Sequence, residues 1–209
     1  MARRLTPEAR RAEIIEVART AITEDGYRSL SLRGLARRCG MSAPGVMHYF
    51  PDMPALLEAV LDHRDETDLA AIIDARGPDV TLVELFDAAR AYYVARSAEV
   101  RNFDTLEAEA LDPNHPAHDY FVRRTERTFE QLRPYIDREF ENPGEVGTVV
   151  RLLLDGSRVA RLRSPALSAV EQEAGWRAIQ DVLDRYPRRG GSEPNAGRDR
   201  HRSRRTPAG

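Results

Sequence analysis

The sequence predicts an all-α fold, and three observations support this prediction. Apolar residues recur at helical spacing in almost every segment, and no segment shows the alternation that is typical of a β-strand. Polar residues that can cap a helix precede these segments, and Gly or Pro often follows them. The 209 residues, of which 41% are hydrophobic, are enough for one domain or two small ones with a hydrophobic core.

The first predicted helix begins after Thr6 and ends at Gly26. Thr6 supplies a capping hydroxyl, Pro7 fits the first turn, and Glu8 lies near the positive end of the helix dipole. Gly26 allows the backbone to leave the helix. One apolar stripe predicts the buried face of this helix: Ile14, Val17, Ala18, Ala21 and Ile22.

Two short helices separated by a glycine turn follow. Ser31 is expected to cap the first, which ends at Arg38. Gly40 makes the turn, and Ser42 caps the second, which ends near Phe50. This arrangement, in a basic stretch of sequence, indicates a DNA-binding helix-turn-helix. Its small or apolar residues are expected to pack inward: Leu32, Leu35, Ala36, Cys39, Met41 and Val46. Cys39 is interpreted as a small buried residue rather than a redox sensor.

Pro44 and Gly45 are unusual in a helix, but with Ser42 as the cap they lie in its first turn. Backbone N–H groups there have no partner within the helix, so proline costs little. Gly45 has no side chain, which allows a DNA backbone or groove floor to come close. The first turn of a recognition helix is the part that faces base edges.

Further helices are expected along the rest of the chain. Asp52 is predicted to cap one that reaches about residue 75. The last 23 residues, 187–209, have no apolar face and are rich in Gly, Pro, Ser and Arg, so they are expected to be disordered. The remaining predicted helices span about 81–97, 99–111, 116–140, 143–163 and 164–186.

The charge is unevenly distributed. The net charge is only −2, but residues 1–50 carry a surplus of four positive charges and residues 187–209 a surplus of five. Residues 51–186 carry a deficit of eleven. Basic ends around an acidic body suggest that the ends bind an anionic partner such as a nucleic acid.

Several classes of protein are not expected. No apolar run reaches the length of a membrane span, and the N-terminus lacks an apolar signal-peptide centre, so a cytoplasmic protein is predicted. A single cysteine excludes an internal disulfide and a thiolate-rich zinc site. No cofactor or metal is expected. One stretch offers possible metal ligands, although capping of the next helix explains them better: Asp112, His115, His118 and Asp119.

The segment "ITEDGYRSLSLRGLARRCGMSAPGVMHYFPDMPALLEAVL" resembles the DNA-binding region of the TetR family of transcriptional repressors. The resemblance covers roughly Ile14 to Leu61. It consists of the Gly-Tyr pair, Ser-x-x-x-Leu-Ala, Gly-Met-Ser and the aromatic-Phe pair before a leucine-rich helix. It implies a three-helix DNA-binding domain over residues 1–51 and a helical effector-binding and dimerisation domain over 52–186. The composition adds a disordered basic tail over 187–209. The resemblance also implies a homodimer that inserts one recognition helix per subunit into successive major grooves of operator DNA.

The resemblance also suggests which residues contact DNA. Met47 and Met53 stand where the family often has a phosphate-binding tyrosine and lysine, so weaker binding and a shallower salt dependence are expected. Arg3, Arg4, Arg10 and Arg11 could compensate as a basic arm. Ala43 and Pro44 can make only apolar contacts, which favours thymine methyl groups as their targets. The expected DNA-contacting residues are Ser31, Arg33, Ser42, Ala43, Pro44, Gly45, His48 and Tyr49.

Arg124 marks a possible ligand site, because helical spacing places it on a largely apolar face. A buried cation is costly unless it is paired. It therefore either pairs with an acid such as Glu107 or Asp155 or awaits an anionic ligand. Aromatic residues at this spacing are also explained as plain core. The candidate ligand-binding residues are Phe86, Tyr93, Phe103, Glu107, Tyr120, Arg124, Asp155 and Trp176.

The predicted helices 143–163 and 164–186 resemble the pair that builds the family's dimer interface. Gly156, Ser157 and Ala160 are small enough for facing helices to approach closely. The sequence thus predicts a repressor that a small effector releases from a palindromic operator. Two alternatives remain, a nonspecific architectural DNA-binding protein and, less well supported, an all-helical enzyme.

Overall fold

The computed structural model describes residues 5–74, 77, 79–163 and 169–190. Within these residues the fold is all-α, with no strand beyond one isolated bridge between Phe140 and Arg188. The helices are α1 (Pro7–Asp25), η1 (Tyr27–Ser29), α2 (Leu32–Arg38), α3 (Ala43–Met47), α4 (Met53–Leu69), η2 (Ala70–Asp74), α5 (Leu82–Val94), α6 (Ser97–Glu109), α7 (His118–Glu139), α8 (Pro143–Arg163) and α9 (Ala169–Leu183).

Local capping explains where the first helices begin. In each case a side-chain oxygen accepts the backbone N–H three residues further on, which satisfies a donor that the helix itself leaves unpaired. The four predicted caps are confirmed: Thr6 for α1, Ser31 for α2, Ser42 for α3 and Asp52 for α4. Gly26 and Gly40 adopt positive φ angles of 77° and 63°, so both predicted turns use glycine's conformational freedom.

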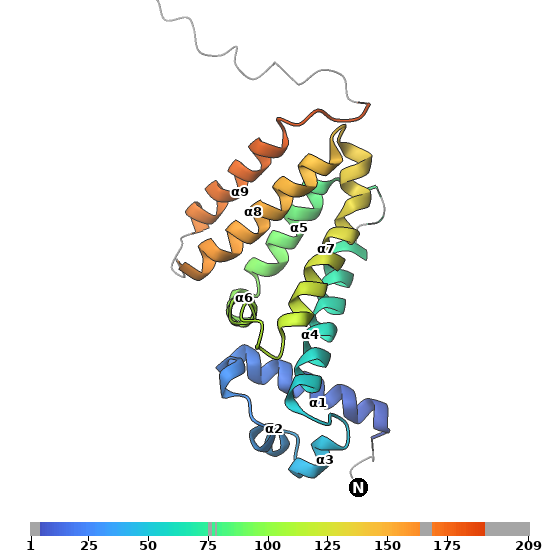
Figure 1. Cartoon of the computed structure of the whole chain (residues 1–209), viewed down its shortest axis with the longest axis vertical. Coiled ribbons are helices and arrows are strands. Elements are labelled where there is room, and N and C mark those ends of the chain that lie inside the picture. Colours follow the sequence, from blue (N-terminus) through green and yellow to red (C-terminus); the bar gives the residue numbers. More distant parts are fainter. Residues whose placement is uncertain (1–4, 75–76, 78, 164–168, 191–209) are drawn as a thin grey trace, which may run out of the picture.

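The helices form an elongated molecule (Figure 1). Helices α1, α2 and α3 lie at one end, and α4 runs from them into the body, alongside α7. Helices α5, α8 and α9 lie towards the other end. Helix α6 lies between the two parts and packs against α1, α5 and α8. Both α4 and α6 therefore connect the N-terminal end to the body.

The buried apolar residues form two clusters. The first lies in α1–α4 and extends to α6 and the start of α7, and its fully buried members include Ile14, Ile22, Leu35, Val46, Leu56, Leu57 and Leu106. The second joins α5, the C-terminal half of α7, α8 and α9, and includes Leu82, Leu85, Phe140, Val146, Val150 and Leu183. The expected domain boundary between residues 51 and 52 falls between α3 and α4, and the first cluster spans it.

Two helices end earlier than predicted. Helix α3 ends at Met47 rather than near Phe50, because Phe50 precedes Pro51 and such a residue disfavours helical backbone angles. Helix α4 loses its α-helical geometry after Leu69 and continues as a π-helical segment, Ala70–Asp74. Nothing in the apolar spacing of the sequence signals this change.

The prediction that the disordered tail begins at residue 187 is wrong, because residues 187–190 are ordered. The backbone N–H of Arg189 donates to the carbonyl oxygen of Glu139 at 2.8 Å, and that of Glu141 donates to Pro187 at 3.0 Å. This segment therefore lies against the end of α7. The rest of the expected tail, residues 191–209, lies outside the described residues, as do residues 164–168, where the last helix was expected to begin. Among the helices that the structure describes, none has the length and apolar content that a bilayer span requires.

Candidate nucleic-acid interface and buried polar network

Helices α2 and α3 form a compact helix-turn-helix. The turn is closed by the Met41 N–H, which donates to the carbonyl oxygen of Ala36 at 2.8 Å. Leu35 and Val46 are 1% and 0% exposed, so each helix buries one side against the first cluster. The opposite side of α3 is exposed to solvent. The unit therefore has the arrangement of a helix-turn-helix, in which one side of the second helix packs on the core and the other side faces outward.

The expected DNA-contacting residues all lie on α2, α3 or the residues that flank them. Five of them are exposed: Ser31, Arg33, Ser42, Pro44 and His48. Three are half-buried: Ala43, Gly45 and Tyr49. Tyr49 packs against the first cluster and meets the His48 ring edge-on at 5.3 Å between ring centroids. The structure thus brings these residues to one end of the molecule, with Tyr49 partly withdrawn into the core.

Gly45 has a structural role in the cap as well as the expected role in the groove. A Cβ atom at this position would lie 3.2 Å from the Ser42 hydroxyl and 3.4 Å from the Met41 side chain. The Gly45 N–H is also the donor that the Ser42 hydroxyl accepts, at 3.2 Å. Absence of a side chain therefore keeps the first turn of α3 free of crowding.

The arginines of α2 differ in whether acids neutralise them. Arg38 is paired with Glu24 at 2.8 Å and with Asp25 at 2.6 Å, both at the end of α1. Arg33 is exposed and has no ion pair or hydrogen bond within the described part of the chain. Arg33 is therefore available to an external anion, whereas Arg38 ties α2 to α1.

The expected basic arm is only partly described. Arg10 pairs with Glu13 within α1, and the guanidinium of Arg11 lies 4.9 Å from the centre of the Phe50 ring. Arg11 thus links α1 to the segment after α3. Arg3 and Arg4 lie outside the described residues. Of the two departures from the family pattern, Met47 is 48% exposed at the end of α3, and Met53 packs against the first cluster.

Helix α6 holds the end of α1 through polar contacts. The Asn102 side-chain amide donates to the carbonyl oxygens of Ile22 and Thr23, at 3.2 and 2.7 Å. The Arg19 guanidinium pairs with Glu99 at 2.8 Å. The Thr23 carbonyl, near the C-terminus of α1, is therefore satisfied by the body, and the Ile22 carbonyl, which also accepts the Gly26 N–H, gains a second donor.

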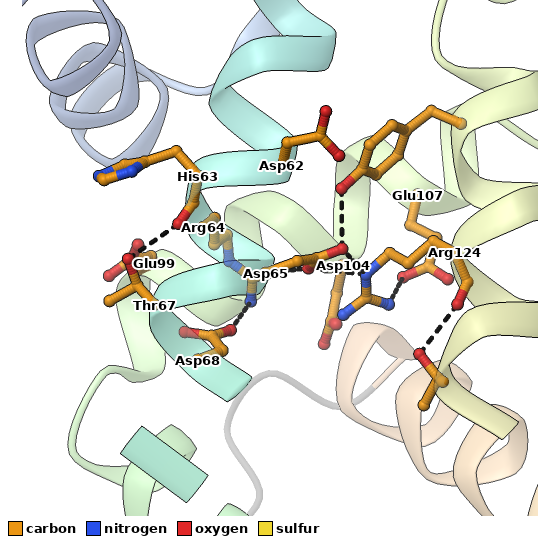
Figure 2. Close-up of polar contacts among 12 residues, drawn as sticks. Asp62, His63, Arg64, Asp65, Thr67, Asp68, Glu99, Asp104, Glu107 and Arg124 are labelled. Atoms are coloured by element: carbon orange, nitrogen blue, oxygen red, sulfur yellow. Dashed lines mark hydrogen bonds and ion pairs between the residues drawn. The ribbon is translucent and has the colours of Figure 1, made fainter. Parts of the chain in front are cut away.

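A buried polar network lies where α4, α6 and α7 meet (Figure 2). Nε of Arg124 donates to both carboxylate oxygens of Asp65 at 2.8 Å, and the Tyr120 hydroxyl donates to Asp65 at 2.8 Å. Burial alone disfavours the charged guanidinium, but Asp65 and Glu107 outweigh it and raise the pKa of Arg124. Burial, together with the charge of Asp65, also raises the pKa of Tyr120.

The network continues from α6 to α8. Arg158 donates to Glu107 at 2.6 Å and lies 3.6 Å from Asp155, while Arg161 pairs with Asp104 at 2.9 Å. Burial raises the pKa of the Glu107 carboxyl, and the nearby arginines offset only part of that effect.

Arg124 is thus paired, as one of the two sequence interpretations proposed. The partner in close contact is Asp65, which sequence reasoning missed, while Glu107 lies at 3.9 Å and Asp155 contacts Arg158 instead. A partial signal was available: acids at 58 and 62 and arginines at 123 and 127 share a four-residue spacing, and Asp65 and Arg124 lie close to them in the sequence. This spacing does not itself pair Asp65 with Arg124. The sequence does not say, however, that these two helices are neighbours.

The candidate ligand residues fall into two groups. Tyr93, Phe103, Glu107, Tyr120 and Arg124 surround the polar network, and Asp155 lies at its edge. Phe86 and Trp176 lie in the second cluster, with their ring centroids 6.0 Å apart. Trp176 is fixed there by its indole N–H, which donates to Asp87 at 2.6 Å. The structure therefore does not bring all eight residues around one centre.

The acid and histidine stretch before α7 makes local turn contacts. Asp112 accepts the Asn114 N–H at 2.9 Å, Nδ1 of His115 accepts the Ala117 N–H at 3.1 Å, and Nδ1 of His118 lies 2.8 Å from the Ala110 carbonyl oxygen. These bonds shape the turn between α6 and α7. They do not cap α7, whose N-cap is Ala117 with no side-chain cap bond, so the capping explanation was wrong in this detail. Within the described residues no group of His, Cys, Asp or Glu is arranged to hold a metal ion.

A shallow concavity of about 270 Å³ lies elsewhere, on α1 and the end of α2. Its lining residues are Glu16, Val17, Thr20 and Arg38. None of the candidate ligand residues contributes to it, and it therefore adds nothing to the expected ligand site.

Comparisons with known proteins agree with this geometry. Residues 14–60 match the sequence model of the bacterial regulatory proteins of the tetR family. This match includes all of α2 and α3 and confirms the resemblance drawn from the sequence. No curated protein matches the chain.

Several solved structures share the fold. A transcriptional regulator from Rhodococcus sp. Rha1 is 19% identical, with a TM-score of 0.66 over 84% of this chain and 97% of that chain. A protein from Rhodococcus sp. described as a TetR-family transcriptional regulator is 20% identical, with a TM-score of 0.65 over 84% and 97%. GusR from Salmonella enterica is 19% identical, with a TM-score of 0.65 over 86% and 95%. The likeness thus extends to the helical body as well as the helix-turn-helix.

Proposed function

We propose that this chain, which residues 14–60 mark as a DNA-binding transcriptional regulator of the TetR type, is a homodimeric repressor. A small effector releases it from a palindromic operator. The observation that carries the proposal is the outward face of α2 and α3. There the unpaired, exposed Arg33 lies on the same unit as the exposed first turn of α3. An exposed cation can bind phosphate, and the first turn can reach base edges.

The dimer is supported by an apolar face of α8 that no described helix covers. Leu152 and Val159 are 66% and 44% exposed, and Gly156 and Ala160 are exposed on the same side of the helix. These positions recur every three to four residues, so they form one stripe. Neighbouring α9 also exposes small residues: Ala174, Gly175 and Ala178. Exposed apolar stripes with small residues suit close packing against a second copy of the same helices.

Release by an effector is supported by the position of the buried polar network. Helix α4 carries Asp65 in this network and begins directly after the helix-turn-helix. A ligand that rearranges the network would therefore bias the position of α4 and, through it, the separation of the two recognition helices. Operator binding needs that separation to match the groove repeat of about 34–36 Å.

Two other functions predict different behaviour. A nonspecific architectural protein would bind any duplex equally, using the basic ends of the chain. An enzyme would need a nucleophile–base pair or an equivalent set of reacting groups. The match over residues 14–60 and the exposed face of α3 favour a sequence-specific DNA-binding protein over the architectural protein and the enzyme.

The decisive experiment is selection from a randomised duplex pool by the full-length protein, followed by sequencing. We expect a palindromic sequence, bound at least about 10³-fold more tightly than random DNA. Leu152→Glu is the matched variant, because an exposed residue can be replaced without disturbing the core, yet a charge there opposes dimerisation. It should elute as a monomer and lose the palindrome. Retention of DNA without any enriched sequence would instead support the architectural alternative.

A further inference from the structure

Arg64, on α4, is a buried cation whose hydrogen-bond donors are incompletely used. Its side chain is only 9% exposed, yet its nearest carboxylate contacts are 3.4 Å to Asp68 and 3.9 Å to Asp65. Its Nε has no hydrogen-bond partner among the residues that the structure describes. Since a guanidinium carries five N–H donors and burying them without acceptors is costly, Arg64 is poised to receive a further acceptor.

The two carboxylates beside Arg64 have closer donors elsewhere. Asp65 is held by Arg124 (Figure 2) and by Tyr120. Asp68 accepts the Tyr93 hydroxyl at 3.2 Å. In this network the Nε of Arg124 is therefore hydrogen-bonded, whereas the buried Nε of Arg64 is not. This distinction moves the expected anion-binding role from Arg124 to its neighbour on α4.

The surroundings of Arg64 favour an organic anion over a small inorganic one. The guanidinium lies 4.4 Å from the centre of the Phe103 ring, and the rings of Tyr92 and Tyr93 meet edge-on at 5.4 Å nearby on α5. Asp65 and Asp68 would repel a doubly charged anion. A planar carboxylate carries a single charge and matches the guanidinium fork with two parallel hydrogen bonds.

Asp68 links such a ligand to the shape of α4. Asp68 lies in the last turn of the helix, directly before the π-helical segment Ala70–Asp74. Short π-helical segments occur frequently at functional sites, where they mark a local departure from regular helix geometry. A carboxylate that binds Arg64 takes the place of the Asp68 carboxylate, and the end of α4 must then rearrange.

We infer that the effector is a monocarboxylate with an apolar or aromatic body, which binds Arg64 beside Phe103 in competition with Asp68. The inference rests on the proposed function in taking the ligand to be the effector. The binding step itself does not depend on DNA, so it can be tested separately.

The test is thermal unfolding of the full-length protein with defined probes. Benzoate, phenylacetate and octanoate are each compared with the corresponding neutral amide, at up to about 10 mM so that millimolar affinity is detected. We expect at least one carboxylate to raise Tm in a concentration-dependent manner, while its amide does not. Equal effects of acid and amide, or no effect of any carboxylate, would overturn the inference.

Two substitutions then assign the binding to Arg64. Arg64→Gln should weaken carboxylate binding at least about tenfold, since it removes a charged hydrogen-bond donor. Arg133→Gln is the matched control, because Arg133 is exposed on α7 and should leave binding unchanged. Asp68→Asn removes the competing carboxylate and should strengthen binding several-fold. A merely structural role of the pair predicts the opposite sign, so Asp68→Asn decides the question even if Arg64→Gln does not fold.

The two proposals fail in different ways. Carboxylate binding that depends on Arg64 but leaves operator affinity unchanged would uphold this site and contradict release by that ligand. Recovery of a palindrome without carboxylate binding would uphold the DNA-binding function and contradict this inference.

Discussion

The N-terminal end of the molecule, formed by α1, α2 and α3 and called here the recognition end, and the buried polar network of the body are stabilised in different ways. At the recognition end, short helices are held by apolar contacts such as those of Leu35 and Val46, and their starts are fixed by caps three residues away. In the body, charged residues that are far apart in the sequence meet in a buried network. The first kind of order is encoded locally, whereas the second exists only once the helices have been assembled.

The contact between α4 and α7 shows how unevenly the ion pairs contribute. The two helices lie side by side and run in the same direction (Figure 1), so Glu58 and Asp62, four residues apart, meet Arg123 and Arg127, which are also four apart. The pairs Glu58–Arg123 and Asp62–Arg127 are about half exposed, with distances of 2.7 and 3.7 Å. Exposed pairs of this kind contribute little to stability. The specificity of the contact therefore depends on the buried pair of Asp65 and Arg124.

The largest effect is expected from Asp65→Ala. This change leaves the guanidinium of Arg124 and the hydroxyl of Tyr120 buried without their main acceptor. We expect the free energy of unfolding, measured by urea denaturation, to fall by about 3–5 kcal/mol. The matched control is Asp62→Ala, on the same helix but in an exposed pair, which should cost no more than about 1 kcal/mol.

A double variant separates the cost of the orphaned charge from the value of the pair. Replacing Asp65 and Arg124 together with leucine should recover much of the lost stability, since no buried charge then remains unpaired. Equal stability losses in Asp65→Ala and Asp62→Ala would show that burial of an ion pair does not determine how much it contributes to the contact between α4 and α7.

The same contrast explains what could be predicted from the sequence. The four caps and both glycine turns were predictable because each depends on residues within one turn of helix. The pairing of Arg124 was not, because Asp65 lies 59 positions away and other acids were equally plausible partners. The π-helical end of α4 and the contact of residues 187–190 with α7 were missed for the same reason. Neither leaves a local pattern in the sequence.

A smaller effect is expected from Ser42→Ala at the recognition end. Loss of the cap leaves the Gly45 N–H without its acceptor, which should lower the free energy of unfolding by about 1 kcal/mol. Ser97→Ala is a suitable control, because Ser97 is an exposed serine at the start of α6 where no side-chain cap bond exists. If both changes cost the same, capping does not explain how α3 is held.

The smallest effect concerns how the recognition helix reads DNA. Pro44 is exposed on the first turn of α3 and Ala43 is half-buried beside it, and neither carries a hydrogen-bonding side chain. Such residues distinguish bases through the thymine methyl group. Once an operator has been selected, replacing a contacted thymine by uracil removes only that methyl. It should weaken binding about fourfold, the equivalent of about 0.8 kcal/mol for one buried methyl group.

The uracil experiment needs a matched substitution in the protein to identify the side chain that contacts the thymine methyl group. Pro44→Ser replaces the apolar surface by a hydroxyl and should make the operator and its uracil variant bind with nearly equal affinity. Uracil placed outside the contacted positions should have no effect on either protein. A uracil effect that persists in Pro44→Ser would assign the methyl contact to another exposed apolar residue, of which Met47 at the end of α3 is the nearest. In that case Met47, which stands where the family often has a phosphate-binding tyrosine, would contact a base instead of a phosphate. The protein would then gain sequence specificity at the position where it loses a phosphate contact.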